Sequence, residues 1–380
     1  MILPERKTIQ FNIKEALFLE TKRILTKDLL PGMIIMEDIY TAKDQLLISS
    51  GEELTNHSIT RLKFHSIDDV KIQENFKKIP FDVFEPVPDS YSEYVKGTVE
   101  FAKFHAALEK ATEAFKYTLS ALTENPNTPL DLNILLQYSN RIFAESRNGT
   151  HVFHMLHCLK ENDDLTYAHS VQVGIICNIF GRWLKMSQED IDTLTICGML
   201  HDVGKLMIPP KIISKRGSLT KGEYNVVQNH PMDGYRMLEN QPLDERIKLA
   251  ALMHHERCDG SGYPDHLTDN QIDEFAKIVA IADIYDAMTC ARVYRSPLCP
   301  FDVISVFEQE GLHKFDPHYS LTFLESIVNT YVNCTVRLSD GRVGDIIMID
   351  NKNLTKPVVK VGASFIDLAK NRDLSIVAII

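Results

Sequence analysis

The sequence predicts a mainly α-helical protein, in which an all-helical central domain is flanked by a small N-terminal mixed β module and a small C-terminal β module. Residues 131 to about 330 read as successive helices, whereas the two ends alternate short apolar runs with turn signals. The chain has 380 residues, too many for one ordinary core, and its 44% of hydrophobic residues is enough to build several. We therefore divide it into a β-rich module (1–80), a linker with an amphipathic helix (81–130), the helical domain (131–330) and a C-terminal β module (331–380).

The N-terminal module is indicated by short apolar runs that end at turn signals such as Ser50-Gly51. Thr55 or Asn56 is expected to cap a short helix, and Val70–Ile72 reads as a strand. A linker follows, because proline removes backbone donors and discourages regular structure on both sides; the prolines are Pro80, Pro86 and Pro88.

A long helix is predicted from about Ser90 to Leu122, ending before Asn125-Pro126. Its apolar residues recur at three- and four-residue steps, namely Phe101, Phe104, Leu108, Ala111, Phe115 and Leu119. Such a stripe needs a partner, which is either the next domain or a second copy of the chain in a homodimer.

The helical domain carries two helix-start signals, Ser187 with Asp190 and Thr220 with Glu223, at capping-box spacing. After this domain, an Asp340-Gly341 turn separates two of the apolar runs that we expect to form strands. The expected strands are 332–338, 343–349, 358–361 and 376–380.

The whole-chain composition limits location and partners. No apolar run reaches the about 18 residues of a membrane-spanning helix, and the first ten residues do not resemble a signal peptide, so we expect a cytoplasmic protein. The seven cysteines form no C-x-x-C pair and are expected to be reduced. A net charge of −11 argues against binding to nucleic acid polymers or anionic membranes, so an anionic substrate needs a local positive site.

Histidine and aspartate residues recur at the ends of apolar helical stretches. His169, taken alone, is best explained as a hydrogen-bonded core histidine, since Val173 and Ile176 follow it on the same helix face. His201-Asp202 closes another apolar stripe, where an unpaired buried carboxylate would be costly and a bound cation would offset that cost. A surface turn with Gly204 as the helix stop is the alternative explanation.

Further clusters extend this pattern. His230 is expected at the end of the helix that starts at Thr220, and His254-His255 closes another apolar helix. Asp283 follows five apolar residues, with Asp286 one turn later, and such an aspartate needs a partner.

Imidazole and carboxylate donors together suit iron, manganese, nickel or zinc, and the lack of a thiolate weakens the case for structural zinc. Two such ions, held by a bridging carboxylate, would lower the pKa of a bridging water and hold both oxygens of an in-line displacement at phosphorus. Lys205, Arg292 and Arg295 are candidates to bind phosphate oxygens, with a solvated surface position as the alternative for each.

Over about residues 150 to 315 the chain resembles the HD-GYP family, a branch of the HD-domain metallohydrolases that degrades cyclic di-GMP. The resemblance is carried by Thr166–Ser170, His201–Lys205, His230-Pro231, His254–Pro264, Ala282–Thr289 and Tyr294-Arg295. It implies two divalent metal ions, most simply iron or manganese, bound by His169, His201, Asp202, His230, His254, His255 and Asp283, with Asp202 bridging.

The resemblance also implies hydrolysis of cyclic di-GMP to linear pGpG, GMP or both through a metal-bridging hydroxide. Asp202 and Lys205 are then the expected catalytic residues, and Lys205, Arg292, Arg295 and Tyr263 the expected substrate-binding residues. GGDEF-type or other signalling proteins are expected partners of the loop that contains Tyr263. Two positions depart from the family pattern: Cys258 replaces a larger residue, and Leu165 stands where some members place a glutamate that binds a third metal.

Three other functions compete with this one. A non-catalytic receptor could bind cyclic di-GMP or a partner protein, although the complete ligand set disfavours it. A hydrolase of another nucleotide would share the same metal chemistry. A purely structural helical domain would leave the buried aspartates unexplained.

Overall fold

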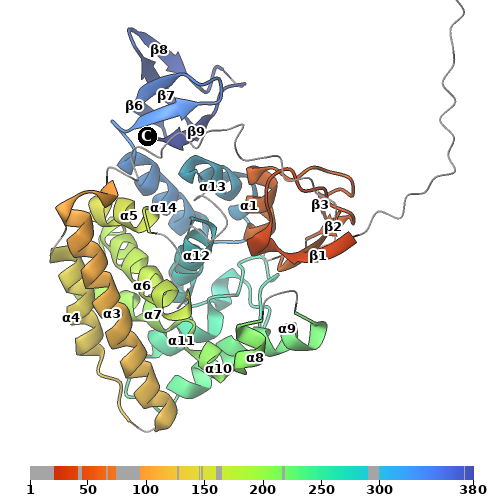
Figure 1. The fold of residues 1–380 in the computed structure, drawn as a ribbon. Helices are drawn as coiled ribbons and strands as arrows, with labels where there is room; N and C mark the ends of the chain where they lie inside the picture. Colours follow the sequence, from red (N-terminus) through yellow and green to blue (C-terminus); the bar gives the residue numbers. More distant parts are fainter. Residues whose placement is uncertain are drawn as a thin grey trace, which may run out of the picture.

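The computed structural model describes eleven stretches of the chain: 21–41, 45–65, 67–73, 95–125, 128–144, 146, 149–159, 165–215, 219–289, 299–371 and 373–380. The mainly helical class with a small β module at each end is confirmed (Figure 1). Within these residues no helix combines the length and the apolar character needed to cross a membrane. Of the cysteines that the structure describes, three are buried and three are partly exposed.

In its described residues, the N-terminal module contains two small antiparallel strand pairs, the short 3-10 helix η1 (Thr26–Asp28) and one α-helix, in keeping with the expected mixed β module. Strand β1 (Thr21–Leu25) pairs with β4 (Asp69–Gln73), and β2 (Ile39–Tyr40) pairs with β3 (Leu46–Ile48). Helix α1 (Asn56–Phe64) begins at Thr55, whose hydroxyl accepts the backbone N–H of Ser58 at 3.0 Å, which settles the choice of cap. The module has a hydrophobic core of its own, built from residues such as Leu29, Ile35, Ile59, Leu62 and Val70.

The linker helix packs within the chain. Helix α3 (Val99–Glu124) begins at the Thr98 cap and ends at Asn125, as the Asn-Pro signal predicts, while residues 90–94 lie outside the described stretches. All six residues of the predicted stripe are buried, against α4 (Leu132–Ala144) and α6 (Leu165–Trp183). The partner of the stripe is therefore the next domain of the same chain, and the argument for a homodimer through this helix is removed.

The helical domain is built around the crossing of α6 with α7 (Gln188–Leu200). The two helices approach closely at Gly174 and Gly198, since a Cβ on Gly198 would lie only 2.8 Å from the Gly174 Cα. The remaining helical elements surround this pair: α5 (Gly149–His157), η3 (Val203–Met207), α8 (Pro210–Ile213), α9 (Lys221–Gln228), α10 (His230–Leu238), α11 (Glu245–Met253), η4 (Asp269–Gln271), α12 (Glu274–Thr289), α13 (Pro300–Val306), the π-helical turn η5 (Phe307–Gly311) and α14 (Pro317–Thr330).

Both predicted helix starts are confirmed, with one difference in detail. Thr220 and Glu223 form a complete capping box at α9. Ser187 caps α7 by accepting the Asp190 N–H at 3.1 Å, but the Asp190 carboxylate binds Arg246 as well as the Ser187 hydroxyl.

The expected position of His230 was wrong. The helix that starts at Thr220 ends at Gln228, and His230 is the first residue of a second helix, α10. Pro231 lies in the first turn of α10, where the missing N–H has no intrahelical partner to lose, so it starts this helix rather than ending the previous one.

The C-terminal module is a five-stranded antiparallel sheet in the order β8-β7-β6-β5-β9. Four strands occupy the predicted segments, and β8 is an addition; the strands are β5 (Thr335–Leu338), β6 (Val343–Asp350), β7 (Asn353–Val361), β8 (Ser364–Asp367) and β9 (Ile376–Ile379). In Figure 1 the sheet lies at the end of the helical domain beside α13 and α14. Its inward residues, including Val336, Ile346 and Val359, belong to the same hydrophobic core as the helical domain.

Candidate metal centre

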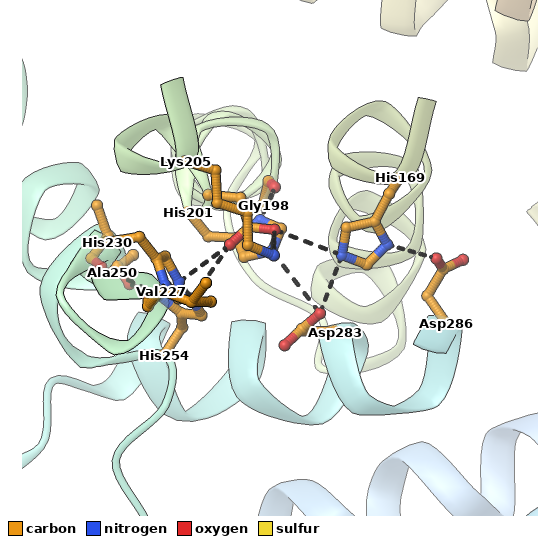
Figure 2. A network of polar contacts seen from close by, with 12 residues as sticks. His169, Gly198, His201, Lys205, Val227, His230, Ala250, His254, Asp283 and Asp286 are labelled. Atoms are coloured by element: carbon orange, nitrogen blue, oxygen red, sulfur yellow. Dashed lines mark hydrogen bonds and ion pairs between the residues drawn. The ribbon is translucent and has the colours of Figure 1, made fainter. Parts of the chain in front are cut away.

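The structure brings all seven predicted ligands together at neighbouring helix ends. His201 caps the C-terminal end of α7, Asp202 precedes η3, His230 starts α10, and His254-His255 follows α11. His169 lies near the start of α6, and Asp283 lies in the middle of α12. Their donor atoms form two groups, in each of which all atoms lie within 4.8 Å of one another: group A contains His169, His201 and Asp283, and group B contains Asp202, His230, His254 and His255. Figure 2 shows group A together with His230 and His254 of group B.

The Asp202 carboxylate lies between the two groups. Its Oδ1 atom faces group B, at 3.2 Å from His230 Nε2 and 3.6 Å from His254 Nε2. Its Oδ2 atom faces group A, at 3.4 Å from His201 Nε2 and 3.8 Å from His169 Nε2. Such a placement would allow the carboxylate to bridge two ions.

Four of the histidines are oriented through Nδ1. His201, His230 and His254 donate from Nδ1 to the backbone carbonyls of Gly198, Val227 and Ala251, at 2.7, 2.7 and 3.0 Å. His169 Nδ1 lies 2.7 Å from Asp286 Oδ2. Because a carbonyl oxygen only accepts, Nδ1 carries a proton in the first three rings, and Nε2 is the nitrogen left to face a metal.

Several buried donors lack the partners that burial normally requires. Among the residues that the structure describes, His201 Nε2 and Asp202 Oδ1 are buried without a hydrogen-bond partner. In group B, the Nε2 atoms of His230 and His254 face each other at 3.2 Å. Two nitrogen ligands about 2.1 Å from one cation lie roughly 3.0–3.4 Å apart, so this spacing fits a shared metal ion.

The electrostatics also favour positive charge in group A. Burial would lower the pKa of His169, but the hydrogen bonds that its ring donates to Asp283 and Asp286 outweigh this effect and raise that pKa to about 10. Burial would also lower the pKa of His201, but Asp202 and Asp283 together outweigh it and raise that pKa to about 9. A divalent cation bound at this position would replace the protons on these two rings, so its binding would release them.

Group B favours neutral imidazoles. Burial, with smaller contributions from His201 and His230, lowers the pKa of His254 to about 4 despite the opposing hydrogen bond to Asp202. Burial and the adjacent histidines hold the pKa of His255 well below its ordinary value. Both rings therefore present lone pairs at neutral pH, as metal ligands must.

Lys205 lies beside the bridging carboxylate. Its ammonium donates to Asp202 Oδ2, and Asp202 raises the pKa of Lys205 against the opposing effect of burial. Burial raises the pKa of Asp202, but Lys205 and His201 outweigh it and hold that pKa well below its usual range. The Lys205 side chain is 27% exposed, so a charged ammonium lies at the edge of the centre, within reach of a ligand.

Two supporting carboxylates had no assigned role in the sequence. Asp286 orients His169, and its spacing of three residues from Asp283 on α12 is the signal that could have identified it. The Glu256 carboxylate, which is almost fully buried, accepts the backbone N–H groups of Asp265 and Leu267 at 2.7 and 2.9 Å. Glu256 therefore fixes the loop that follows His255.

The structure describes some of the remaining residues that the sequence singled out and leaves others untested. Tyr263 is stacked on His255, with ring centroids 4.6 Å apart. Gly204 is buried against α10 rather than placed in a surface turn. Arg292 and Arg295 lie outside the described residues, as do Asp163, Asp164 and the Leu165 side chain, so their expected roles stay predictions.

Comparisons with known proteins agree with this centre. Residues 154–319 match the HD domain family. The chain is 35% identical over 204 residues to a cyclic di-GMP phosphodiesterase of Pseudomonas aeruginosa, covering 53% of this chain and 49% of that protein. It is 33% identical to a cyclic di-GMP phosphodiesterase response regulator of Xanthomonas campestris, covering 46% and 47%, and 34% identical to a 3'3'-cGAMP-specific phosphodiesterase of Vibrio cholerae, covering 41% and 36%.

The helical fold and the two histidine-aspartate groups define the central part of this chain as an HD domain, a helical metal-binding domain. Together with the run from His254 to Pro264, these relatives indicate that this HD domain is of the HD-GYP type. It spans about half the length of the first two relatives.

Proposed function

We propose that this chain is a metal-dependent phosphodiesterase that hydrolyses cyclic di-GMP to linear pGpG, GMP or both. One observation carries the proposal: the two donor groups share the Asp202 carboxylate, so two divalent ions fit side by side. The names of several relatives, which are cyclic di-GMP phosphodiesterases, support the substrate class. Imidazole and carboxylate donors without a thiolate favour iron or manganese.

When bound, two such ions would activate water and stabilise the charge that develops on a phosphodiester. The chain's own residues then have three tasks. The Nδ1 hydrogen bonds fix the histidine rings, so the ligand set is pre-organised. Asp202 sets the spacing of groups A and B. Lys205 supplies an ammonium beside Asp202 that can bind a phosphate oxygen, together with Arg292, Arg295 and Tyr263 as further substrate contacts.

A second candidate substrate is 3'3'-cGAMP, because three relatives of this chain, all from Vibrio cholerae, are named as phosphodiesterases specific for it. The two substrates share the phosphodiester ring and differ in one base. Product analysis with cyclic di-GMP, 3'3'-cGAMP and the linear dinucleotides, at matched concentrations, separates the two activities. We expect the highest kcat/KM with cyclic di-GMP.

The test begins with protein purified anaerobically, stripped with a chelator and reloaded with Fe²⁺ or Mn²⁺. We expect two ions per chain and recovery of hydrolysis on reloading. Three ions per chain would contradict the proposed ligand set, in which Leu165 offers no carboxylate. Tight binding of cyclic di-GMP without turnover in the loaded protein would favour the receptor instead.

A further inference from the structure

His255 is held differently from the other histidines of the centre. The rings of His169, His201, His230 and His254 each bond through Nδ1 to an acceptor. Among the described residues, no hydrogen bond orients the His255 ring, although it belongs to group B. Its ring instead lies against aromatic neighbours, and the parallel one is Tyr263, at 4.6 Å between centroids and 24° between planes.

The loop that carries Tyr263, here called the GYP loop (Cys258–Pro264), folds back onto the backbone of His255. The Tyr263 N–H donates to the His255 carbonyl at 3.2 Å. A Cβ on Gly262 would lie 2.5 Å from both that carbonyl oxygen and the Arg257 nitrogen, so only glycine allows this approach.

The far side of the loop is also fixed to the histidine turn. Glu256 accepts the N–H groups of Asp265 and Leu267 at 2.7 and 2.9 Å. The Arg257 guanidinium donates to the His254 carbonyl at 3.1 Å. The position of the Tyr263 ring is thus set by bonds to the same turn that carries the two ligands, and the ring can in turn define the orientation of His255.

We propose that Tyr263 is a positioning residue for the metal ion of group B, and that its stacked ring takes the place of the Nδ1 hydrogen bond that His255 lacks. This inference rests on the proposed function only in requiring that the centre bind metal. It differs from substrate binding by Tyr263, because the effect precedes substrate and acts on one ion of the two. The phenolic hydroxyl has no part in it, whereas the aromatic face is essential.

The test is a Mn²⁺ titration of the metal-stripped full chain by calorimetry, without substrate. For Tyr263→Ala we expect one ion bound as in the unaltered protein and the second weakened by about 10- to 100-fold, the usual effect of losing a residue that orients a ligand. Tyr263→Phe keeps the aromatic face and should bind both ions normally. Tyr235→Ala, on α10, removes a ring whose hydroxyl reaches Glu245 and is the matched control, expected to bind both ions.

Three results would overturn the proposal: normal binding of both ions by Tyr263→Ala, equal weakening by Tyr263→Phe, or weakening by Tyr235→Ala. Retention of the group A ion shows that Tyr263→Ala is folded. If that variant does not fold, Tyr263→Leu retains apolar volume without a ring face and must show the same selective weakening. A chain that binds two ions but cleaves no cyclic dinucleotide would refute the proposed function and leave this inference standing.

Discussion

Asp202 is the residue on which both halves of the metal centre depend. It is almost fully buried, and each of its oxygens faces a different donor group. Removing it leaves Lys205 and four imidazoles without their common negative charge, and a buried charge without a partner is strongly unfavourable.

We therefore predict that Asp202→Ala abolishes hydrolysis of cyclic di-GMP and reduces bound metal below one ion per chain. Asp202→Asn, which keeps the shape and removes the charge, should lose activity as well but retain more thermal stability. Metal content by elemental analysis and turnover by chromatography measure both effects. A purified Asp202→Ala protein with most of its metal and turnover would show that the assigned centre is wrong.

Asp286 offers a second test at the level of one residue. Its Oδ2 atom lies 2.7 Å from His169 Nδ1, so it orients a ligand without being among the seven assigned ligands. We predict that Asp286→Ala weakens the group A ion by about 10- to 100-fold, whereas Asp286→Asn, whose amide oxygen still accepts the Nδ1 proton, weakens it less. Metal titration without substrate checks this order. Equal affinities for the unaltered chain and Asp286→Ala would return Asp286 to a purely structural role.

The sequence pointed to the seven candidate ligands in two ways: histidine and aspartate residues end several apolar helical stretches, and the motifs that contain them resemble those of the HD-GYP family, which implied the full set. It could not predict which ligands face each other, since group A joins α6, α7 and α12 and group B joins the starts and ends of other helices. The Nδ1 partners were equally inaccessible, because three of them are backbone carbonyls that any residue supplies.

At the level of elements, the packing of η3 against α10 brings Asp202 to His230. The two elements touch at Gly204, where a Cβ would collide with the His230 carbonyl oxygen and the Gly234 nitrogen. Both obstacles are backbone atoms, which cannot move aside like a side-chain end. Separation of η3 from α10 would therefore displace a ligand as well as reduce stability.

We predict that Gly204→Ala lowers the free energy of unfolding by about 1–3 kcal/mol, as expected for overpacking, and weakens the group B ion. Gly222→Ala is the matched control, since no atom lies within 4 Å of its added Cβ on α9. That control should raise the free energy of unfolding by up to about 1 kcal/mol, because alanine is the better helix former. Urea unfolding of both variants gives the comparison, and a Gly204→Ala chain as stable as Gly222→Ala would contradict the proposed contact.

Most elements were predictable from local signals, and the errors arose where those signals are ambiguous. The caps at Ser187 and Thr220 were identified, and Thr55 was one of two candidates, because each side chain satisfies a free N–H in the first turn of its helix. The position of His230 was wrong because the proline that follows it can lie after the end of one helix or in the first turn of the next, and the local sequence does not decide between them. Strand β8 was not predicted, because it is four residues long and is defined by its pairing with β7.

At the scale of the whole molecule, the N-terminal module is attached to the helical domain through α1. The Phe64 ring contacts Phe307 and Phe315, with centroids 5.4 and 5.8 Å away. Arg61 and His65 both bind the Glu310 carboxylate on η5. Lys314 donates to His65 Nδ1 at 2.8 Å, so the neutral His65 ring donates from Nε2 to Glu310. The partners are 245 residues apart in sequence, which is why no local pattern predicted them.

This ion cluster makes the attachment sensitive to acid. Burial would raise the pKa of Glu310, but hydrogen bonds from His65 and Arg61 overcome it and lower that pKa from 4.5 to about 2. Between these two values the unfolded chain binds more protons than the folded one, so stability falls as the pH falls. Above about pH 5 the Glu310 carboxylate makes its full contribution to the free energy of unfolding, which is on the order of 3 kcal/mol. We predict that Glu310→Gln lowers the free energy of unfolding at pH 7 by an amount of this order.

The difference in unfolding free energy between the unaltered chain and Glu310→Gln should then shrink steadily from pH 5 toward pH 2.5, measured by urea unfolding at fixed ionic strength. Glu308 on the same turn is the matched control, because its pKa is shifted in the opposite direction. Burial raises the pKa of Glu308, so ionisation of its carboxyl group lowers the stability of the folded chain as the pH rises. Glu308→Gln therefore cannot remove the loss of stability that acid causes. A Glu310→Gln difference that stays constant with pH, or that Glu308→Gln reproduces, would show that the Glu310 carboxylate does not hold the N-terminal module through its charge.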